Sequence, residues 1–275
     1  MKTADVRLLQ ELLNEAGLAA GAVDGLRGPR TNAAVRAGLK AIGLASSGLE
    51  LPTGWGDWSA RRQAVLYLQF RCAEAALPVG PLDGLWGPQT EYATEQLAHL
   101  REHGEPEPPW RDAVEAAASG SAWPREAELE TTFGPPGEHL VMLELPYPLR
   151  LSWDLRTSVT RTQCHVRVRD SLRSILEAVL AHYGLDGIRE LRLDRYGGGY
   201  NHRNKRGGSR LSTHAWGIAF DFDPARNRLR WGRDRAAFAG VAYETWWRCW
   251  EREGWISLGR ARNFDWMHVQ AARLD

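Results

Sequence analysis

Two short stretches near the C-terminal end combine histidine and aspartate side chains that could hold a metal ion. Residues 212–221 have the form S-x-H-x-x-G-x-A-x-D and supply His214 and Asp221, and a later D-x-x-H stretch supplies Asp265 and His268. Two imidazoles and one carboxylate match the three protein ligands of a catalytic zinc, whose remaining position is left for water. We therefore predict that His214, Asp221 and His268 bind one Zn²⁺ ion per chain.

The elements expected around the first stretch would place two of these ligands. Residues 218–223 alternate apolar side chains with small or acidic ones, which is typical of a half-buried strand. Asp221 is then expected on the inward face of that strand. His214 precedes the strand and can fold back across Gly217, because glycine accepts backbone conformations that other residues avoid.

The second stretch is expected to bring the third ligand on another strand, over residues 267–271. Successive side chains of a strand point to opposite faces, so a separation of three residues would turn Asp265 away from His268 within one regular strand. We therefore expect Asp265 in the turn just before the strand. From there its carboxylate could act as a general base towards water and then protonate a leaving amine.

The rest of the C-terminal half reads as a mixture of helices and strands. Residues 172–183 show helical spacing of apolar side chains, with Gly184 as a stop. Alternation at 191–193 predicts a strand, and residues 234–253 predict a helix that carries several tryptophans. Because no regular β-α-β alternation is present, the sequence predicts an α+β domain over residues 131–275.

The N-terminal half contains an internal repeat. Residues 23–31 recur as residues 82–90, and apolar residues upstream match at the same offset. Each copy reads as helix, turn, helix, because Asp-Gly supplies a turn and Gly-Pro a second break. Thr31 and Thr90 stand where a helix N-cap is expected. The sequence therefore predicts two small all-α modules.

These modules are expected over residues 1–45 and 58–103. The chain from 104 to 130 is rich in Glu, Pro, Ala, Gly and Ser, which suits a linker, although Asp112–Ala118 could form a short helix. The zinc domain would follow from residue 131.

The composition argues against some classes of partner and location. Thirty-five basic and 34 acidic side chains give a net charge of +1, which argues against nucleic acid as the main partner. The N-terminal residues mix charge into every turn and contain no apolar run of the length that a signal peptide or a membrane span requires. We therefore expect no membrane span and a chain made in the cytosol. Three cysteines are expected to be reduced thiols: Cys72, Cys164 and Cys249.

Some side chains resemble site residues but are expected to be structural. Asp223 shares a face with Asp221, yet strand neighbours two apart rarely reach one ion. His165 and His202 are expected to be hydrogen-bonded residues outside the metal site. The tryptophans of the predicted helix are expected either in the core or along a substrate cleft, with core packing the simpler interpretation; they are Trp246, Trp247 and Trp250.

The two metal-binding motifs, in this order and spacing, resemble the zinc peptidases of the VanX/VanY D-alanyl-D-alanine peptidase family, which includes phage L-alanyl-D-glutamate endopeptidases. The resemblance spans residues 130–272. It implies that the three predicted ligands bind zinc and that Asp265 is the catalytic acid/base. It also implies that Arg203 holds the scissile carbonyl oxygen as that atom gains charge, and that Ser212 hydrogen-bonds the substrate.

The repeated N-terminal motif resembles the peptidoglycan-binding domain repeat found on many cell-wall hydrolases. Both copies carry the pattern V-x-x-L-Q … G-x-(V/L)-D-G-x-x-G-P-x-T, although the first has Arg27 where the second has Trp86. The resemblance implies that the modules bind the wall through their motif loops. The residues assigned to these loops are Asp24, Gly25, Asp83, Gly84 and Trp86.

Together the two resemblances imply a modular phage endolysin with bacterial peptidoglycan as its partner. We expect a monomer that is stored in the host cytoplasm and acts on the wall after release, cutting the stem peptide between L-Ala and D-Glu. One alternative is a bacterial D,D- or L,D-carboxypeptidase or an antibacterial effector. Another is a non-catalytic wall-binding protein that keeps zinc for folding.

Overall fold

The computed structural model describes residues 1–44, 49–106 and 122–274. The chain divides into two compact units, Met1–Pro108 with Lys205–Arg210, and Pro109–Asn204 with Leu211–Asp275. Each unit has its own hydrophobic core. The short helix predicted at Asp112–Ala118 lies outside the described residues.

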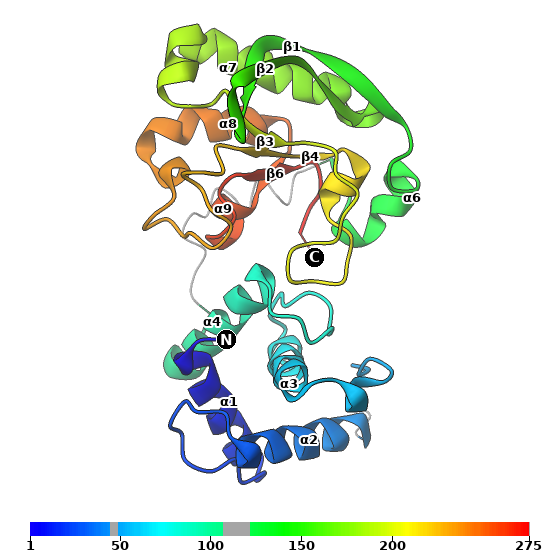
Figure 1. The fold of residues 1–275 in the computed structure, drawn as a ribbon, viewed down its shortest axis with the longest axis vertical. Helices are drawn as coiled ribbons and strands as arrows, with labels where there is room; N and C mark the ends of the chain where they lie inside the picture. The colour runs from blue at the N-terminus through cyan, green and yellow to red at the C-terminus, as the bar shows by residue number, and fades with distance from the viewer. Residues whose placement is uncertain (45–48, 107–121, 275) are drawn as a thin grey trace. The chain divides into compact units, whose positions relative to one another are not determined.

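The first unit is all-helical in its described residues (Figure 1). Its elements are α1 (Thr3–Glu15), α2 (Pro29–Leu44), η1 (Trp55–Asp57), α3 (Ala60–Glu74) and α4 (Pro88–His103). Both repeats contribute to one core, in which Leu9 and Leu39 of the first repeat join Leu68 and Leu97 of the second. The two repeats are therefore halves of one packed body, each burying the apolar face of the other.

A buried glutamine organises the motif loop of the second repeat. The Nε2 group of Gln69 donates to Asp83 Oδ1 at 3.0 Å, to the Leu85 carbonyl at 3.2 Å and to Thr90 Oγ1 at 3.2 Å. Its Oε1 atom accepts the Gly84 N–H at 2.7 Å. One side chain thus fixes the loop between α3 and α4 at several points.

The first repeat builds the same network around Gln10. The Gln10 amide bonds Asp24 Oδ1 at 2.9 Å and the Gly25 N–H at 2.9 Å. Gly25 and Gly84 both have positive φ, of 78° and 68°. A Cβ at Gly84 would lie 2.7 Å from the Arg62 carbonyl oxygen, so glycine is required for space as well as conformation. The motif Asp-Gly pairs are therefore part of the fold, and Trp86 packs half-buried against the shared core.

The expectation that Thr31 and Thr90 cap their helices is wrong. Helices α2 and α4 begin at Pro29 and Pro88, so each threonine lies inside the first turn. Proline suits the first helical position because it has no N–H to leave unpaired and a fixed φ. The threonine hydroxyls instead accept hydrogen bonds from the buried glutamines.

The second unit combines a mixed six-stranded sheet with helices, which confirms the α+β class. The strand order is β2-β1-β3-β4-β6-β5, and only β1 and β3 pair in parallel. The strands are β1 (Leu140–Leu151), β2 (Asp154–His165), β3 (Arg195–Gly198), β4 (Ala219–Phe222), β5 (Ile256–Ser257) and β6 (His268–Gln270).

Two helices pack against each other over the sheet, α7 (Arg169–Glu190) and α8 (Glu244–Arg252) (Figure 1). The shorter elements are η2 (Glu126–Glu128), α6 (Leu129–Phe133), η3 (Val166–Val168), η4 (Thr213–Trp216), η5 (Ala237–Ala239), η6 (Val241–Tyr243) and α9 (Leu258–Arg262). In the described residues no helix is both long enough and apolar enough to cross a bilayer.

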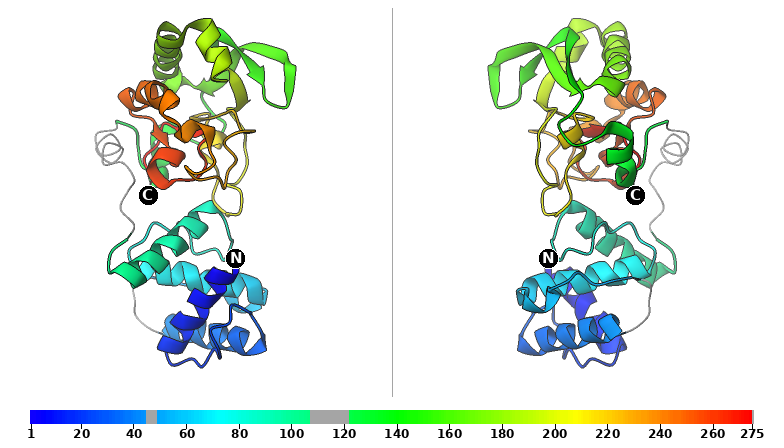
Figure 2. Two further views of the ribbon diagram at one scale, coloured as in Figure 1. Left: turned by 90° about the vertical axis from the view of Figure 1, so that its left-hand side faces the viewer. Right: turned by 90° about the vertical axis from the view of Figure 1, so that its right-hand side faces the viewer.

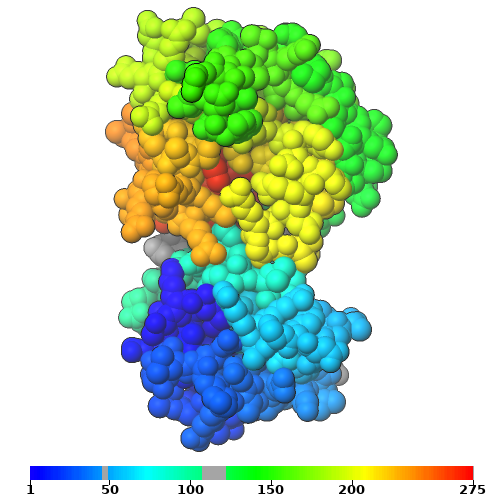
Figure 3. Space-filling view, viewed as in Figure 1, coloured from blue at the N-terminus to red at the C-terminus, as the bar shows by residue number. Residues whose placement is uncertain are grey.

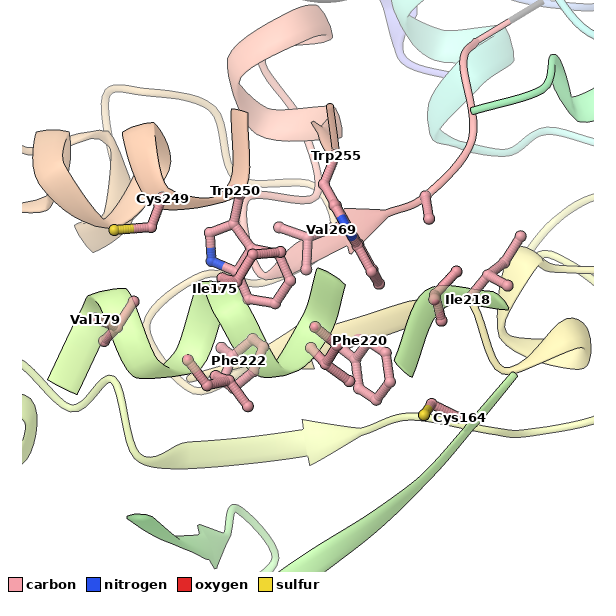
Figure 4. Close-up of a cluster of buried hydrophobic side chains, with 14 of the residues drawn as sticks. Cys164, Ile175, Val179, Ile218, Phe220, Phe222, Cys249, Trp250, Trp255 and Val269 are labelled. Carbon is pink, nitrogen blue, oxygen red and sulfur yellow. The ribbon is translucent and has the colours of Figure 1, made fainter. Parts of the chain in front are cut away.

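The core of the second unit is rich in aromatic side chains. Figure 4 shows Phe220 and Phe222 of β4 beside Ile175 of α7 and Trp250 of α8. The Phe222 ring meets the Trp250 ring with centroids 5.7 Å apart. The alternation predicted for residues 218–223 is confirmed, since the phenylalanines face this core. The three α8 tryptophans are all buried, so core packing is confirmed for Trp246, Trp247 and Trp250. The cysteines are likewise buried and unpaired as disulfides.

The predicted helix over residues 234–253 is wrong in its first half. Only α8 is helical there, and residues 237–243 form two short 3₁₀ turns separated by the extended Gly240. The buried Asn227 side chain accepts the Phe238 N–H at 2.8 Å, which takes this donor away from a helix. This hydrogen bond holds the first of the two 3₁₀ turns that precede α8.

Two other boundaries differ from the sequence prediction. The strand expected at 191–193 is a turn, with the Leu193 N–H bound to the Ile188 carbonyl, and β3 begins only at Arg195. The helix over 172–183 is confirmed. Its backbone breaks at Gly184 (φ 62°, ψ 173°) as predicted, but helical residues continue beyond the break to Glu190.

We predict that replacing Gln69 with leucine destabilises the first unit. The substitution leaves the Gly84 N–H and the Asp83 carboxylate without their buried partner, which should cost about 2–4 kcal/mol of unfolding free energy. Thermal and urea unfolding of the full chain, followed by circular dichroism, measures the change. Lys40→Ala, at an exposed position of α2, is the control and should be near neutral. Equal stability of the two variants would contradict the structural role of the glutamine.

Candidate metal centre

Backbone pairing brings two of the predicted ligands together. Asp221 on β4 and His268 on β6 are direct partners in the antiparallel register, so their side chains share a face of the sheet. His268 lies on the last strand, as the sequence predicted.

The third ligand returns to the sheet through a tight turn. His214 lies in η4, which ends at Gly217 in the left-handed conformation. A Cβ at Gly217 would lie 3.0 Å from the His165 backbone nitrogen, so the turn needs glycine. The His214 carbonyl accepts the Asn201 N–H at 3.1 Å, which holds the turn beside the chain that leaves β3.

The three ligand atoms form a nearly equilateral triangle. His214 Nε2 lies 3.2 Å from Asp221 Oδ1 and 3.2 Å from His268 Nδ1, and His268 Nδ1 lies 3.0 Å from Asp221 Oδ1. Ligand atoms about 2.0–2.1 Å from a tetrahedral zinc are about 3.3 Å apart. The spacing therefore fits three corners of a zinc tetrahedron, and these residues form a group that could hold a metal ion.

The outer hydrogen bond of His214 fixes which ring nitrogen faces the centre as an acceptor. His214 Nδ1 lies 2.7 Å from the Gly199 carbonyl oxygen. A carbonyl only accepts, so Nδ1 carries the proton and donates. Nε2 is then left with a lone pair directed at the other two ligands.

His268 is oriented in the same way by a glutamine. Its Nε2 lies 3.1 Å from Gln270 Oε1, while Gln270 Nε2 donates to Glu126 Oε1 at 3.0 Å and to the Ala272 carbonyl at 3.1 Å. These two acceptors fix the amide so that its oxygen faces His268. The imidazole therefore donates from Nε2 and presents the Nδ1 lone pair to the centre.

Three lone pairs thus converge in a buried place. His214 is 2% exposed and His268 5% exposed. Without a metal, any proton that enters the cluster stays on a ring nitrogen: burial raises the pKa of the Asp221 carboxyl, but the charge of a protonated His214 and hydrogen bonds from the two rings outweigh it and hold that pKa far below its usual range. Converging acceptors repel unless a cation or a shared proton lies between them. Two nitrogens and one oxygen are a ligand set that zinc accepts.

The predicted catalytic aspartate lies where the sequence places it, in the turn before β6. Asp265 has φ 55°, and its N–H donates to the Leu229 carbonyl at 2.9 Å. Its own carbonyl accepts the His268 N–H at 3.0 Å. This turn brings the two Cα atoms within about 7 Å of each other. The Asp265 backbone therefore lies close to that of His268, and the residue is itself buried.

The two predicted substrate-binding residues are joined by their backbones. The Ser212 N–H donates to the Arg203 carbonyl at 2.9 Å, and the neighbouring residues Asn204 and Leu211 form an antiparallel β-bridge. Ser212 is buried next to η4, whereas Arg203 is partly exposed and donates from Nη1 to the Asn204 carbonyl at 3.2 Å. Both residues therefore flank the turn that carries His214, and their roles towards substrate stay predictions.

Two of the side chains expected to be structural have other partners. Asp223 forms an ion pair with Arg226. His165 bonds the Phe133 carbonyl at 2.9 Å and accepts the Arg167 N–H at 3.1 Å. His202 is exposed. The structure therefore gathers only the predicted trio at the centre among the described residues.

Sequence reasoning missed the groups that orient the ligands. Gln270 could have been found, because it follows His268 by two residues on a strand and so shares its face. Glu126 and the Gly199 carbonyl carry no comparable signal, since each is far from its partner in sequence. Thr213 Oγ1 also contacts Gln270 Oε1 at 3.1 Å.

The surface of the second unit is hollowed above the segment that contains β6 (Figure 3). In Figure 3 the red C-terminal segment that contains β6 is visible at the bottom of a hollow. Yellow and orange segments border it, and these correspond to the loops around η4 and after β4. The Asp221 side chain keeps 15% of its surface exposed, so a small ligand can reach the cluster from solvent.

Comparisons with protein-family models, with curated proteins and with solved structures found no match to this chain.

We predict that the chain binds about one zinc ion and that each ligand is required. His214→Ala and Asp221→Ala should lose the metal, because two remaining ligands cannot close the tetrahedron. Elemental analysis after dialysis measures the content, with His202→Ala as a matched histidine control. Chelation should lower the melting temperature of the wild type and added zinc should restore it. Full zinc content in both ligand variants would contradict the site.

Gln270→Met should weaken zinc binding without removing a ligand. Methionine fills a similar volume but cannot accept the His268 Nε2–H, so the ring loses its fixed orientation. The expected loss in zinc affinity is about 10- to 100-fold. Competition with a chromogenic chelator measures it, and an unchanged affinity would show that Gln270 has no part in orienting the ligand.

Proposed function

We propose that the protein is a zinc-dependent endopeptidase that cuts the stem peptide of bacterial peptidoglycan. The observation that carries the proposal is the convergence of His214, Asp221 and His268, and the backbone turn next to His268 contains Asp265. The motifs that supply these residues resemble those of zinc peptidases acting on cell-wall peptides. The N-terminal repeats add support, because their motif resembles a peptidoglycan-binding repeat.

A zinc ion held by the trio would supply Lewis acidity, which lowers the pKa of water and polarises a carbonyl. The Asp265 carboxylate takes the proton of the attacking water and then gives it to the leaving amine. Arg203 offers a guanidinium to the carbonyl oxygen as negative charge develops on it. Ser212 positions the substrate by a hydrogen bond.

The bond that we propose is L-Ala–D-Glu, and the setting is a phage endolysin acting on the host wall. In this proposal the repeats hold the chain on peptidoglycan, which raises the local concentration of stem peptides around the zinc unit.

Replacing Asp265 by asparagine should abolish hydrolysis while zinc remains bound. The amide keeps the shape of the side chain but cannot accept a proton, so we expect a loss of about 100- to 10,000-fold in kcat. Hydrolysis of purified peptidoglycan and the zinc content are measured on the same preparation. Asp234→Asn, at an exposed position of a neighbouring loop, is the control. Full lytic activity of Asp265→Asn would refute its role as general base.

The products identify the bond that is cut. Mass spectrometry of the digest should show new N-terminal glutamate that is absent when chelator is added. Release of D-alanine alone would make the protein a carboxypeptidase. No product from the zinc-loaded wild type would favour a non-catalytic wall-binding protein.

A further inference from the structure

The turn that joins β1 to β2 presents a tryptophan to solvent. Trp153 is 67% exposed and is the one aromatic residue among the exposed large hydrophobic side chains of the described residues. Leu155, 52% exposed, follows in the same turn region. The other described tryptophans are buried or half-buried. The exposed indole offers a large flat apolar surface to a ligand.

The backbone around Trp153 is held in place on both sides. Leu151 pairs with Asp154 across the turn, and the Ser152 N–H donates to the Tyr196 carbonyl on β3 at 2.9 Å. The Asp154 carboxylate accepts the Thr157 hydroxyl at 2.6 Å and also the Arg156 N–H. The indole is therefore carried by a fixed turn, which lowers the entropy lost when it binds a ligand.

Strand pairing connects this turn, through β3, to the strand that carries Asp221. Leu151 is in register with Tyr196 of β3, and Tyr196 is in register with Phe222 of β4, next to Asp221. Two strand spacings separate β1 from β4, which amounts to about 10 Å. Figure 2 shows the green β1–β2 hairpin standing out from the second unit, and in Figure 3 green residues border the hollow above the red segment.

The proposed substrate can cover much of the distance between these strands. In peptidoglycan the first stem residue is joined to an amino sugar through a lactyl group. The L-Ala unit and the lactyl group therefore separate the scissile carbonyl from the sugar ring, about 7 Å in an extended chain. The flat C–H face of a sugar ring packs well on an indole, which offers a large apolar surface.

We propose that Trp153, with Leu155 near it, forms a subsite for the amino sugar that carries the stem peptide. This inference rests on the proposed function and deepens it. The zinc unit would then prefer stem peptides still attached to glycan over free peptides. Its substrate is in that case the intact wall, with released fragments cut more slowly.

The test compares two substrates with three variants of the full zinc-loaded chain. The substrates are a disaccharide-linked tetrapeptide and the same tetrapeptide with an acetylated N-terminus. Trp153→Ala should raise KM for the sugar-linked substrate about three- to tenfold, leave kcat little changed and leave the sugar-free peptide unaffected. Trp153→Tyr keeps a ring and should retain most of the preference. Met142→Ala, an exposed apolar residue at the base of the same hairpin, is the matched control.

The outcomes separate the inference from the function on which it rests. If the wild type cuts both peptides equally well, or Trp153→Ala affects both alike, the sugar subsite is refuted while the endopeptidase stands. If the wild type cuts neither, the proposed function fails. Calorimetric titration with the disaccharide peptide then decides the subsite alone. Tighter binding of this ligand than of the sugar-free peptide, lost in Trp153→Ala, supports the subsite, and equal binding overturns it. Unchanged melting curves exclude misfolding as the cause.

Discussion

The central constraint on the second unit is that three hydrogen-bond acceptors meet within 3.2 Å of each other in a buried place. Such an arrangement is unfavourable without a positive charge between the acceptors. The hydrogen bonds of the outer ring nitrogens favour this arrangement. The Gly199 carbonyl and the Gln270 amide oxygen each accept a hydrogen bond from the histidine nitrogen that faces away from the centre. Backbone and side-chain groups thus orient the two histidines so that their lone pairs point inwards, as in a preorganised metal site.

The strands that carry the ligands are short, so their precision must come from elsewhere. β4 has four residues and β6 has three. The opposite face of β4 bears Phe220 and Phe222, which pack into a core of tryptophans from α8 and from the chain after it. Large rigid side chains with few rotatable bonds immobilise the strand from behind. Trp246, Trp250 and Trp255 thus help to hold a small sheet in place.

The ligands could be predicted because short sequence motifs contain the residue types that bind metal. Much of the fold could not be predicted in this way. His214, Asp221 and His268 follow from residue types and spacing, and the turn at Asp265 follows from the two-residue period of strands. The long β1–β2 hairpin was missed, since its alternation is broken by prolines in β1. The 3₁₀ turn at Ala237–Ala239, within the predicted helix, is held by the side-chain amide of Asn227. Interactions of this kind leave no periodic signal in the sequence.

In the repeats, the residues of one motif can be required both for folding and for binding. Gln10 and Gln69 bind the Asp-Gly pairs of their loops, so the shared motif letters are accounted for by the loop structure itself. Residues required for folding are kept in every copy, whether or not that copy binds a ligand. Positions at which the two copies differ are therefore more informative about binding than positions at which they are the same. Arg27 and Trp86 occupy equivalent places on equivalent loops, and an indole offers a flat apolar face that a guanidinium on a flexible stem does not. If the helical unit holds the wall unequally through its two halves, that pair of positions is where the inequality arises.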